Sequence, residues 1–187
     1  MSQRVSRRDA RRRIVAATAG LLATSRFREL TVETVMAEAG LARTVFYRHF
    51  GGLPDLVLAA LDDAVEAAPA APPRTVHEML ERNVALFAAH GRLLAAVEEA
   101  AHHDAEVERA YREAFERSVD AVAPLLARHV AEPRAVARAL MHLNASYLTD
   151  ILARTPEPDA DEALRTLWTV WSRVLGITEA PPRSYPA

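Results

Sequence analysis

The sequence predicts an all-α protein built from two helical domains. Apolar residues recur at helical spacing along nearly the whole chain, and no segment shows the alternating pattern of a half-buried β-strand. Glycines and prolines fall between the periodic segments, where they would end helices. Residues 31–50 have the pattern of two short helices separated by a glycine, as in a helix-turn-helix. We therefore expect a helix-turn-helix domain over residues 1–52 and a larger helical domain over residues 53–187.

Composition and charge indicate a globular chain with a basic N-terminal part. Half of the 187 residues are apolar. Cysteine is absent, which excludes disulfides, thiolate nucleophiles and cysteine-based zinc sites and is compatible with a cytoplasmic location. Residues 1–50 contain ten arginines and four acidic residues, whereas the rest of the chain contains 13 basic and 21 acidic residues. This asymmetry is typical of a protein that binds nucleic acid through one domain.

The first predicted helix covers residues 7–23. Ile14, Thr18, Leu21 and Leu22 form its apolar stripe, and the arginine-rich residues 1–13 would act as a phosphate-binding arm. Paired arginines before the apolar run IVAATAGLLA also allow a twin-arginine export signal. We favour the amphipathic helix, because no A-x-A-like cleavage site closes that run and charged residues follow at once. No later stretch is apolar and long enough to span a membrane.

The helix-turn-helix pattern begins at Thr31, whose hydroxyl can cap the first helix. Gly40 is expected to end that helix in the left-handed conformation that a sharp turn needs. The second helix should direct Val45, Phe46 and Phe50 inward. Its outward side would carry Arg43, Thr44, Tyr47, Arg48 and His49.

The outward side chains have the chemistry of nucleic-acid recognition. Arginine can form two parallel hydrogen bonds to a guanine edge or bind phosphates, and tyrosine, threonine and histidine can each bond to a phosphate or a base. A solvated charged face is the alternative, which we consider weaker because the positive charge coincides with the helix-turn-helix. The expected DNA-binding residues are Thr31, Arg43, Thr44, Tyr47, Arg48 and His49.

The same segment resembles the DNA-binding domain of the TetR family of one-component transcriptional regulators. The resemblance rests on the threonine that begins the first helix, on Ala39-Gly40-Leu41, and on Tyr47, His49 and Phe50. It implies a homodimer that binds a palindromic double-stranded DNA operator, acts as a repressor, and is released by a small apolar effector. The sequence departs from the family pattern at four positions, which are Met36, Ala42, Val45 and Leu53.

Two of these departures affect DNA contacts directly. Ala42 cannot cap the recognition helix as the serine or threonine usual in the family would. Leu53 replaces a lysine that would bind phosphate. The resemblance therefore implies the fold more firmly than the individual DNA contacts.

The rest of the chain has a helical pattern throughout. A connector helix over residues 53–68 should join the two domains, and Pro69 with Pro72-Pro73 should end it. Pro124 should kink one later helix or divide it in two, and the tail from Thr178 should be poorly ordered. The later helices are expected at 75–89, 92–102, 104–130, 133–154 and 159–176, with Gly91 separating the first two.

A ligand site is expected in the larger domain. Asn144 and Tyr147 lie on a mostly apolar helix, and a buried amide is costly unless it is paired, so Asn144 is either a structural residue or a ligand anchor. Around residues 139–144 and 164–175 the chain resembles the mycobacterial repressor of ethionamide activation, a TetR-family protein with an apolar ligand tunnel. The expected ligand-binding residues are Phe87, Tyr111, Asn144, Tyr147 and Trp168.

The last predicted helix is apolar around more than one stripe, so it must be covered on two sides. One side can be its own domain, and the resemblance implies that the other is a second subunit. The small residues Ala135, Ala139 and Ser146 on the preceding helix would permit close approach. The apolar positions of the last helix are Leu164, Leu167, Trp168, Val170, Trp171, Val174 and Leu175.

We expect no metal site, no cofactor and no enzymatic activity. His102-His103-Asp104 is better explained as an exposed turn, because adjacent residues on a helix do not face one site. The acidic clusters lack the partnered base or nucleophile that acid–base catalysis requires. Two alternatives compete with the regulator: an all-helical enzyme or small-molecule carrier with no DNA-binding role, and an exported helical protein.

Overall fold

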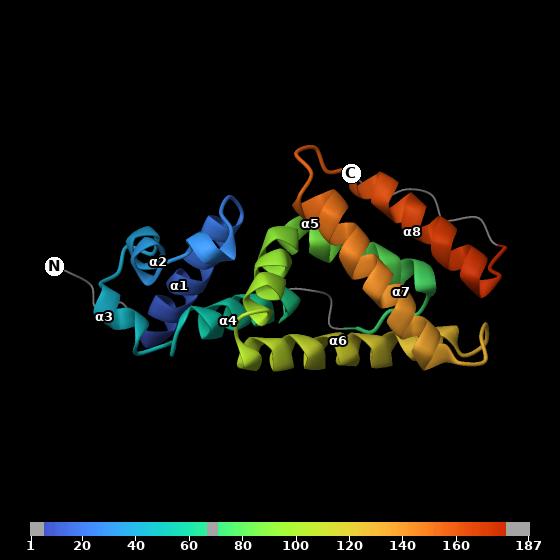
Figure 1. Cartoon of the computed structure of the whole chain (residues 1–187), viewed down its shortest axis with the longest axis horizontal. Coiled ribbons are helices and arrows are strands. Elements are labelled where there is room, and N and C mark those ends of the chain that lie inside the picture. The colour runs from blue at the N-terminus through green and yellow to red at the C-terminus, as the bar shows by residue number, and fades with distance from the viewer. Residues whose placement is uncertain (1–5, 67–70, 179–187) are drawn as a thin grey trace. The chain divides into compact units, whose positions relative to one another are not determined.

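A computed structural model describes residues 6–66 and 71–178 (Figure 1). Helices account for most of these residues and no β-strand occurs among them, which confirms the predicted all-α class. The start of the arginine arm, Pro69 and the tail beyond Thr178 lie outside the described residues. The α-helices are α1 (Arg7–Leu22), α2 (Val32–Glu38), α3 (Arg43–Phe46), α4 (Leu53–Glu66), α5 (Val76–Ala101), α6 (Ala105–Leu126), α7 (Pro133–Leu148) and α8 (Ala160–Leu175).

Two short turns of other helix types complete the described structure. A 3₁₀ turn, Phe27–Glu29, lies between α1 and α2, and a π-helical turn, Thr149–Ala153, continues α7. None of the helices within residues 6–66 and 71–178 combines the length and the apolar character needed to cross a membrane.

The chain divides into two compact units. The first comprises the residues up to Val65 together with Arg92–Tyr111, and the second comprises Glu66–Gly91 together with the residues from Arg112 onward. Because each boundary falls inside a helix, α5 and α6 each contribute to both units. The functional boundary expected after residue 52 stays a prediction.

A continuous apolar core holds the first unit together. In it, α1 packs on α2 and α2 packs on α3. The connector helix α4 belongs to the same core, since Leu56 and Val57 are fully buried in it. Because α4 is anchored in this core, any movement of α4 would carry the helix-turn-helix with it. Fully buried members of the core include Ile14, Leu22, Val35, Phe46, Leu56, Val57 and Val97.

The expected helix break at Gly91 is wrong. A single helix, α5, runs from Val76 to Ala101 through that glycine. A Cβ atom at Gly91 would lie 3.1 Å from the Cβ atom of Ala153, so the glycine permits close approach of α5 to the π-helical turn. Gly91 is therefore explained by packing within the second unit and not by a chain reversal.

The helix that contains Pro124 is neither divided in two nor extended to residue 130. It is one helix, α6, which ends at Leu126. Proline has no N–H to donate to the carbonyl one turn earlier, and its ring crowds that carbonyl, so a helix is weakened there. The chain accommodates Pro124 in the last turn, two residues before the helix ends.

Candidate nucleic-acid interface

Local hydrogen bonds fix the start of α2, as predicted for Thr31. The hydroxyl of Thr31 accepts a hydrogen bond from the backbone N–H of Thr34 at 3.1 Å. The hydroxyl of Thr34 in turn accepts one from the N–H of Thr31 at 3.1 Å, which completes a reciprocal cap. The orientation of α2 is thereby set by contacts within one helical turn.

The turn between α2 and α3 is held by a residue of α1. Gly40 has φ of 62°, which confirms the predicted left-handed conformation. The guanidinium of Arg13 donates a hydrogen bond to the carbonyl of Ala39 at 2.6 Å and closes over the turn. Arg13, expected to belong to a phosphate-binding arm, is thus used to hold the helix-turn-helix in place.

The inward and outward sides of the recognition segment are as predicted except at Val45 and His49, which are both half-buried. Phe46 is fully buried, Phe50 is 4% exposed and Val45 is half-buried. The α-helical part, α3, is only four residues long, and Ala42 at its start provides no side-chain cap. Among the expected DNA-binding residues, Thr31, Arg43, Thr44, Tyr47 and Arg48 are exposed and His49 is half-buried.

Arg43 is held by two neighbours. Its guanidinium forms an ion pair with the carboxylate of Glu33 in α2, with Nη1 to Oε1 at 3.0 Å. The pKa of Arg43 is raised, first by a side-chain hydrogen bond with Tyr47 and then by the charges of Tyr47 and Glu33. In the absence of DNA, the residue expected to read a base therefore already has an acidic partner.

Arginines from α1 extend this surface, although the set of expected DNA-binding residues did not include them. Arg7 lies close enough for its Nη2 atom to donate to the carbonyl of Arg48 at 3.5 Å, and the Arg11 guanidinium lies 5.8 Å from the centre of the Phe50 ring. The pKa of His49 is lowered, first by burial and then by the charges of Arg7, Arg11 and Arg48. The sequence signal was the spacing of Arg7 and Arg11, which places both on one side of α1.

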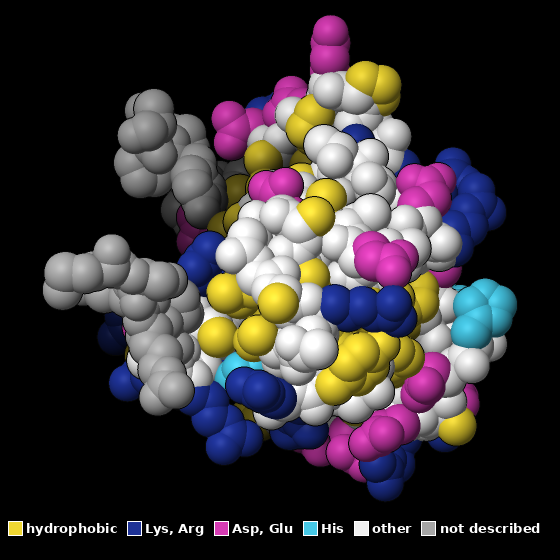
Figure 2. Space-filling view, turned by 90° about the vertical axis from the view of Figure 1, so that its left-hand side faces the viewer, with side chains coloured by type: hydrophobic (Ala, Val, Ile, Leu, Met, Phe, Trp, Pro, Cys, Tyr) yellow, Lys and Arg dark blue, Asp and Glu magenta, His cyan; other side chains and the backbone are white. Residues whose placement is uncertain are grey.

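Figure 2 looks onto the side of the molecule where α2 and α3 lie in Figure 1. On this face the arginine side chains form separate groups among hydrophobic and acidic side chains, and they do not merge into one continuous basic surface.

The expected ligand-binding residues do not all lie in one unit. Phe87 and Trp168 are buried and Tyr147 is half-buried, all in the second unit. Tyr111 packs against the core of the first unit, where burial, and then the charge of Glu98, raises its pKa. Trp168 instead has the ring of His77 as its neighbour, with centroids 5.2 Å apart.

Asn144 is a fully buried residue of α7. The indole N–H of Trp171 in α8 donates a hydrogen bond to its Oδ1 atom at 2.9 Å. Its Nδ2 atom is buried and has no hydrogen-bond partner among the described residues. The sequence alone left open whether Asn144 is a structural residue or a ligand anchor. The bond from Trp171 fits a structural role, and the unpaired Nδ2 donor fits a ligand anchor.

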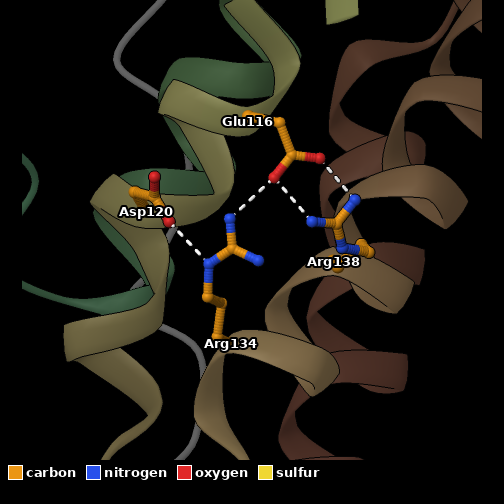
Figure 3. Close-up of polar contacts among 4 residues, drawn as sticks. All are labelled: Glu116, Asp120, Arg134 and Arg138. Atoms are coloured by element: carbon orange, nitrogen blue, oxygen red, sulfur yellow. Dashed lines mark hydrogen bonds and ion pairs between the residues drawn. The ribbon is translucent and has the colours of Figure 1, made fainter. Parts of the chain in front are cut away.

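A polar cluster that the sequence analysis missed joins α6 and α7 (Figure 3). Arg134 contacts Asp120 and Glu116, each at 2.8 Å, and Arg138 forms two hydrogen bonds to Glu116, one of them at 2.6 Å. The available signal was a pair of acids four residues apart on one helix and a pair of arginines four residues apart on the next.

Apolar side chains remain exposed on the last two α-helices. The exposed fraction of Leu143 in α7 is 39%, and that of Val174 in α8 is 50%. Ala135 and Ala139 are exposed on the same side of α7 as Leu143, at spacings of four residues. The other stripe of α8 is buried, with Leu167 and Trp171 at 0% exposure, so α8 has an inner and an outer apolar side.

Within the described residues, no group of three histidine, cysteine or acidic side chains is arranged to hold a metal ion. His102 and His103 are exposed at the turn before α6, and Asp104 accepts hydrogen bonds from the backbone N–H groups of Glu106 and Val107. The carboxylate of Asp104 therefore caps α6.

Comparison with known proteins finds a family match for the helix-turn-helix segment. Residues 14–60 match the sequence model described as bacterial regulatory proteins, tetR family. No curated protein sequence gives a significant match. The family match covers the second half of α1, all of α2 and α3, and the first half of α4, and so includes the elements that form the exposed recognition side.

Solved structures share the fold over most of the chain. A protein from Rhodococcus sp., described as a TetR-family transcriptional regulator, superposes with a TM-score of 0.74 at 17% identity, covering 89% of this chain and 98% of that one. The fatty acid degradation regulator FadR from Bacillus halodurans gives 0.70 at 13% identity, with 90% and 96% covered. A transcriptional regulator from Saccharomonospora viridis in complex with choline gives 0.68 at 18% identity, with 89% and 96% covered.

Proposed function

We propose that this chain, a transcriptional regulator with a TetR-family DNA-binding domain, is a homodimeric repressor that a small apolar effector releases from a palindromic operator. The observation that carries the proposal is the exposed side of the recognition segment, where Arg43, Thr44 and Tyr47 lie on α3 and its C-terminal end, directly after the turn at Gly40. A DNA-binding regulator of this kind would act in the cytoplasm.

In this proposal the recognition residues have different tasks. Arg43 reads a base edge in the major groove, because its guanidinium can form two parallel hydrogen bonds to guanine. Arg48, Thr44 and His49, together with Arg7 of α1, position the domain on phosphates, which fixes the register of the recognition segment on the duplex. Tyr47, whose side chain raises the pKa of Arg43, orients that guanidinium.

Dimerisation would use the outer sides of α7 and α8. Exposed apolar residues such as Leu143 and Val174 gain free energy when a second copy covers them, and the exposed Ala135 and Ala139 allow close helix contact. A palindromic operator places equivalent half-sites about one helical turn apart, roughly 34–36 Å, so a fixed dimer is needed to bind both.

The effector would bind in the second unit. Burial of an amide N–H without a partner is costly, and an acceptor oxygen on a small apolar ligand would satisfy the free Nδ2 atom of Asn144. Phe87, Tyr147 and Trp168 would supply apolar contact area. One structurally similar regulator is described in complex with choline, and another as a regulator of fatty acid degradation; these descriptions support a small-molecule effector. The likeness to the mycobacterial repressor of ethionamide activation remains a prediction.

The release step requires coupling between effector and DNA. An effector can shift the dimer away from its DNA-binding geometry only by binding the released state more tightly. We assign transmission to α4, because it is anchored in the core of the first unit and leads along the chain into the second. A shift from 1:99 to 99:1 would require about 5.5 kcal/mol of differential binding, which two effectors on one dimer could share.

The proposal is tested by selecting duplexes from a random library with the purified protein and measuring affinity against salt. Affinity should fall as salt rises, with a slope of log affinity against log salt of about −0.9 per neutralised phosphate. Arg43→Ala should weaken binding to the selected duplex by about 1–3 kcal/mol and relax specificity at one base pair, whereas Arg28→Ala, at an exposed arginine of the 3₁₀ turn, should not.

A helical small-molecule-binding protein or enzyme without a DNA-binding role is the alternative function. It would show no enrichment of any duplex sequence, and whatever duplex binding it showed would be equal in the wild type and in Arg43→Ala. That combination of results would overturn the proposed recognition surface.

A further inference from the structure

The ion pair between Glu33 and Arg43 crosses from the first turn of α2 to the first turn of α3, with atoms 3.0 Å apart. The two side chains are 73% and 60% exposed, so neither is buried in the core of the first unit. The pair therefore contributes little to folding stability. It does, however, place a carboxylate directly against the guanidinium that we expect to contact DNA.

A carboxylate in this position weakens contacts of Arg43 with phosphate. An exposed ion pair changes an equilibrium by at most about fivefold, which is comparable to one solvent-exposed contact between arginine and a phosphate. A bidentate contact with guanine discriminates against the wrong base by roughly fivefold to more than a hundredfold. The ion pair engages Nη1 of Arg43, which leaves the Nη2 and Nε donors to form two parallel hydrogen bonds to a guanine edge without displacing Glu33, while an isolated phosphate gains nothing by displacing it.

We propose that Glu33 is a specificity-determining residue of the DNA-binding surface. It occupies Arg43 when the domain lies on non-specific DNA and repels nearby phosphates, so Arg43 contributes to affinity only where a guanine edge is presented. This inference rests on the proposed DNA-binding function and extends it, because it assigns a role to an acidic residue on a surface otherwise described by its cations.

Glu33→Gln removes the charge while keeping the shape of the side chain. Glu38→Gln is the matched control: Glu38 is exposed on the same helix and forms no ion pair within residues 6–66 and 71–178. Each variant is made in the wild type and in Arg43→Ala. Circular dichroism verifies that all are folded, and fluorescence anisotropy measures affinity for the selected duplex and for a scrambled duplex of equal length and composition.

Glu33→Gln should raise affinity for the scrambled duplex about fivefold and for the selected duplex less than twofold, so that the specificity ratio falls. Glu38→Gln should leave that ratio unchanged. In the Arg43→Ala background, Glu33→Gln should no longer alter the ratio, because no guanidinium is left to release.

Equal effects of Glu33→Gln and Glu38→Gln would show that only net charge matters, and would overturn the inference. So would a change in the ratio that persists without Arg43. Both outcomes leave the proposed function intact, because the wild type still binds its selected duplex. If the wild type enriches no duplex at low salt, the proposed function fails and the inference fails with it.

Discussion

The indole N–H of Trp171 donates a hydrogen bond to Oδ1 of Asn144 across 2.9 Å, and both side chains are fully buried. The bond joins α7 to α8 and fixes the orientation of the amide, since its oxygen is already engaged. The Nδ2 atom is also buried, and none of the residues that the structure describes accepts a hydrogen bond from it. An effector with an acceptor atom would satisfy this buried donor.

Replacement of either residue should separate the two roles of Asn144. Asn144→Ala and Trp171→Phe both break the hydrogen bond and leave a buried group unpaired, so each should lower the free energy of unfolding by about 1–3 kcal/mol in urea denaturation. Asn144→Ala alone removes the Nδ2 donor and should reduce effector sensitivity without changing effector-free operator binding. If Trp171→Phe reduces effector sensitivity equally, or if Asn144→Ala loses operator binding together with stability, Asn144 is purely structural.

Gly91 and Gly20 should respond differently to the same substitution. Both lie inside helices, where alanine is more favourable than glycine by up to about 1 kcal/mol. Gly20 has open space at the Cβ position, so Gly20→Ala should stabilise the protein. Gly91→Ala should not, because its Cβ would press on Ala153, and Gly91→Val should cost about 1–3 kcal/mol. Thermal unfolding measures the difference, and stabilisation by Gly91→Ala equal to that of Gly20→Ala would refute the packing explanation.

A charge on the outer side of α8 should prevent dimerisation. Val174 is half exposed in one chain, and a second subunit would bury it, so Val174→Glu would place a carboxylate inside the proposed interface. Val170→Glu should act in the same way. Analytical ultracentrifugation should then find monomers, and operator binding should weaken strongly. Val65→Glu is the control, since Val65 is 53% exposed on α4. A wild type that is monomeric at micromolar concentration would contradict the dimer.

Binding to DNA should depend on pH through His49. In the free protein the pKa of His49 is lowered by burial and by neighbouring arginines, so the ring is neutral at pH 7. Phosphates would neutralise those arginine charges and raise the pKa, so that the complex binds more protons than the free protein. Affinity should therefore rise as the pH falls from about 7.5 to about 6, on either side of the ordinary histidine pKa of about 6.5.

His49→Gln keeps hydrogen-bonding capacity but does not titrate, so it should remove this pH dependence at constant ionic strength. Anisotropy titrations at several pH values measure it. A pH dependence that survives in His49→Gln must arise from another group, and a fall in affinity at lower pH would contradict the sign.

The sequence by itself determined those features of the helix-turn-helix that depend on contacts within one turn. The cap at Thr31 needs only a hydroxyl three residues before an N–H, and Gly40 needs only the absence of a Cβ atom. The inward side of α3, with Phe46 and Phe50, follows from helical periodicity. Each of these features is encoded in residues at most a few positions apart, which is why they could be predicted without coordinates.

Only the tertiary structure decided which distant residues meet. Arg13 could serve as a phosphate-binding residue or as a support for the turn, and its bond to the carbonyl of Ala39 follows from the packing of α1 on α2. The same holds for Glu33 with Arg43 and for Trp171 with Asn144. In the sequence, Gly91 had the pattern of a helix end. In the structure it lies inside a helix, where a glycine is needed because Ala153, 62 positions later in the chain, packs against it. Such contacts depend on how helices pack, and packing is a property of the whole fold and not of any short stretch of sequence.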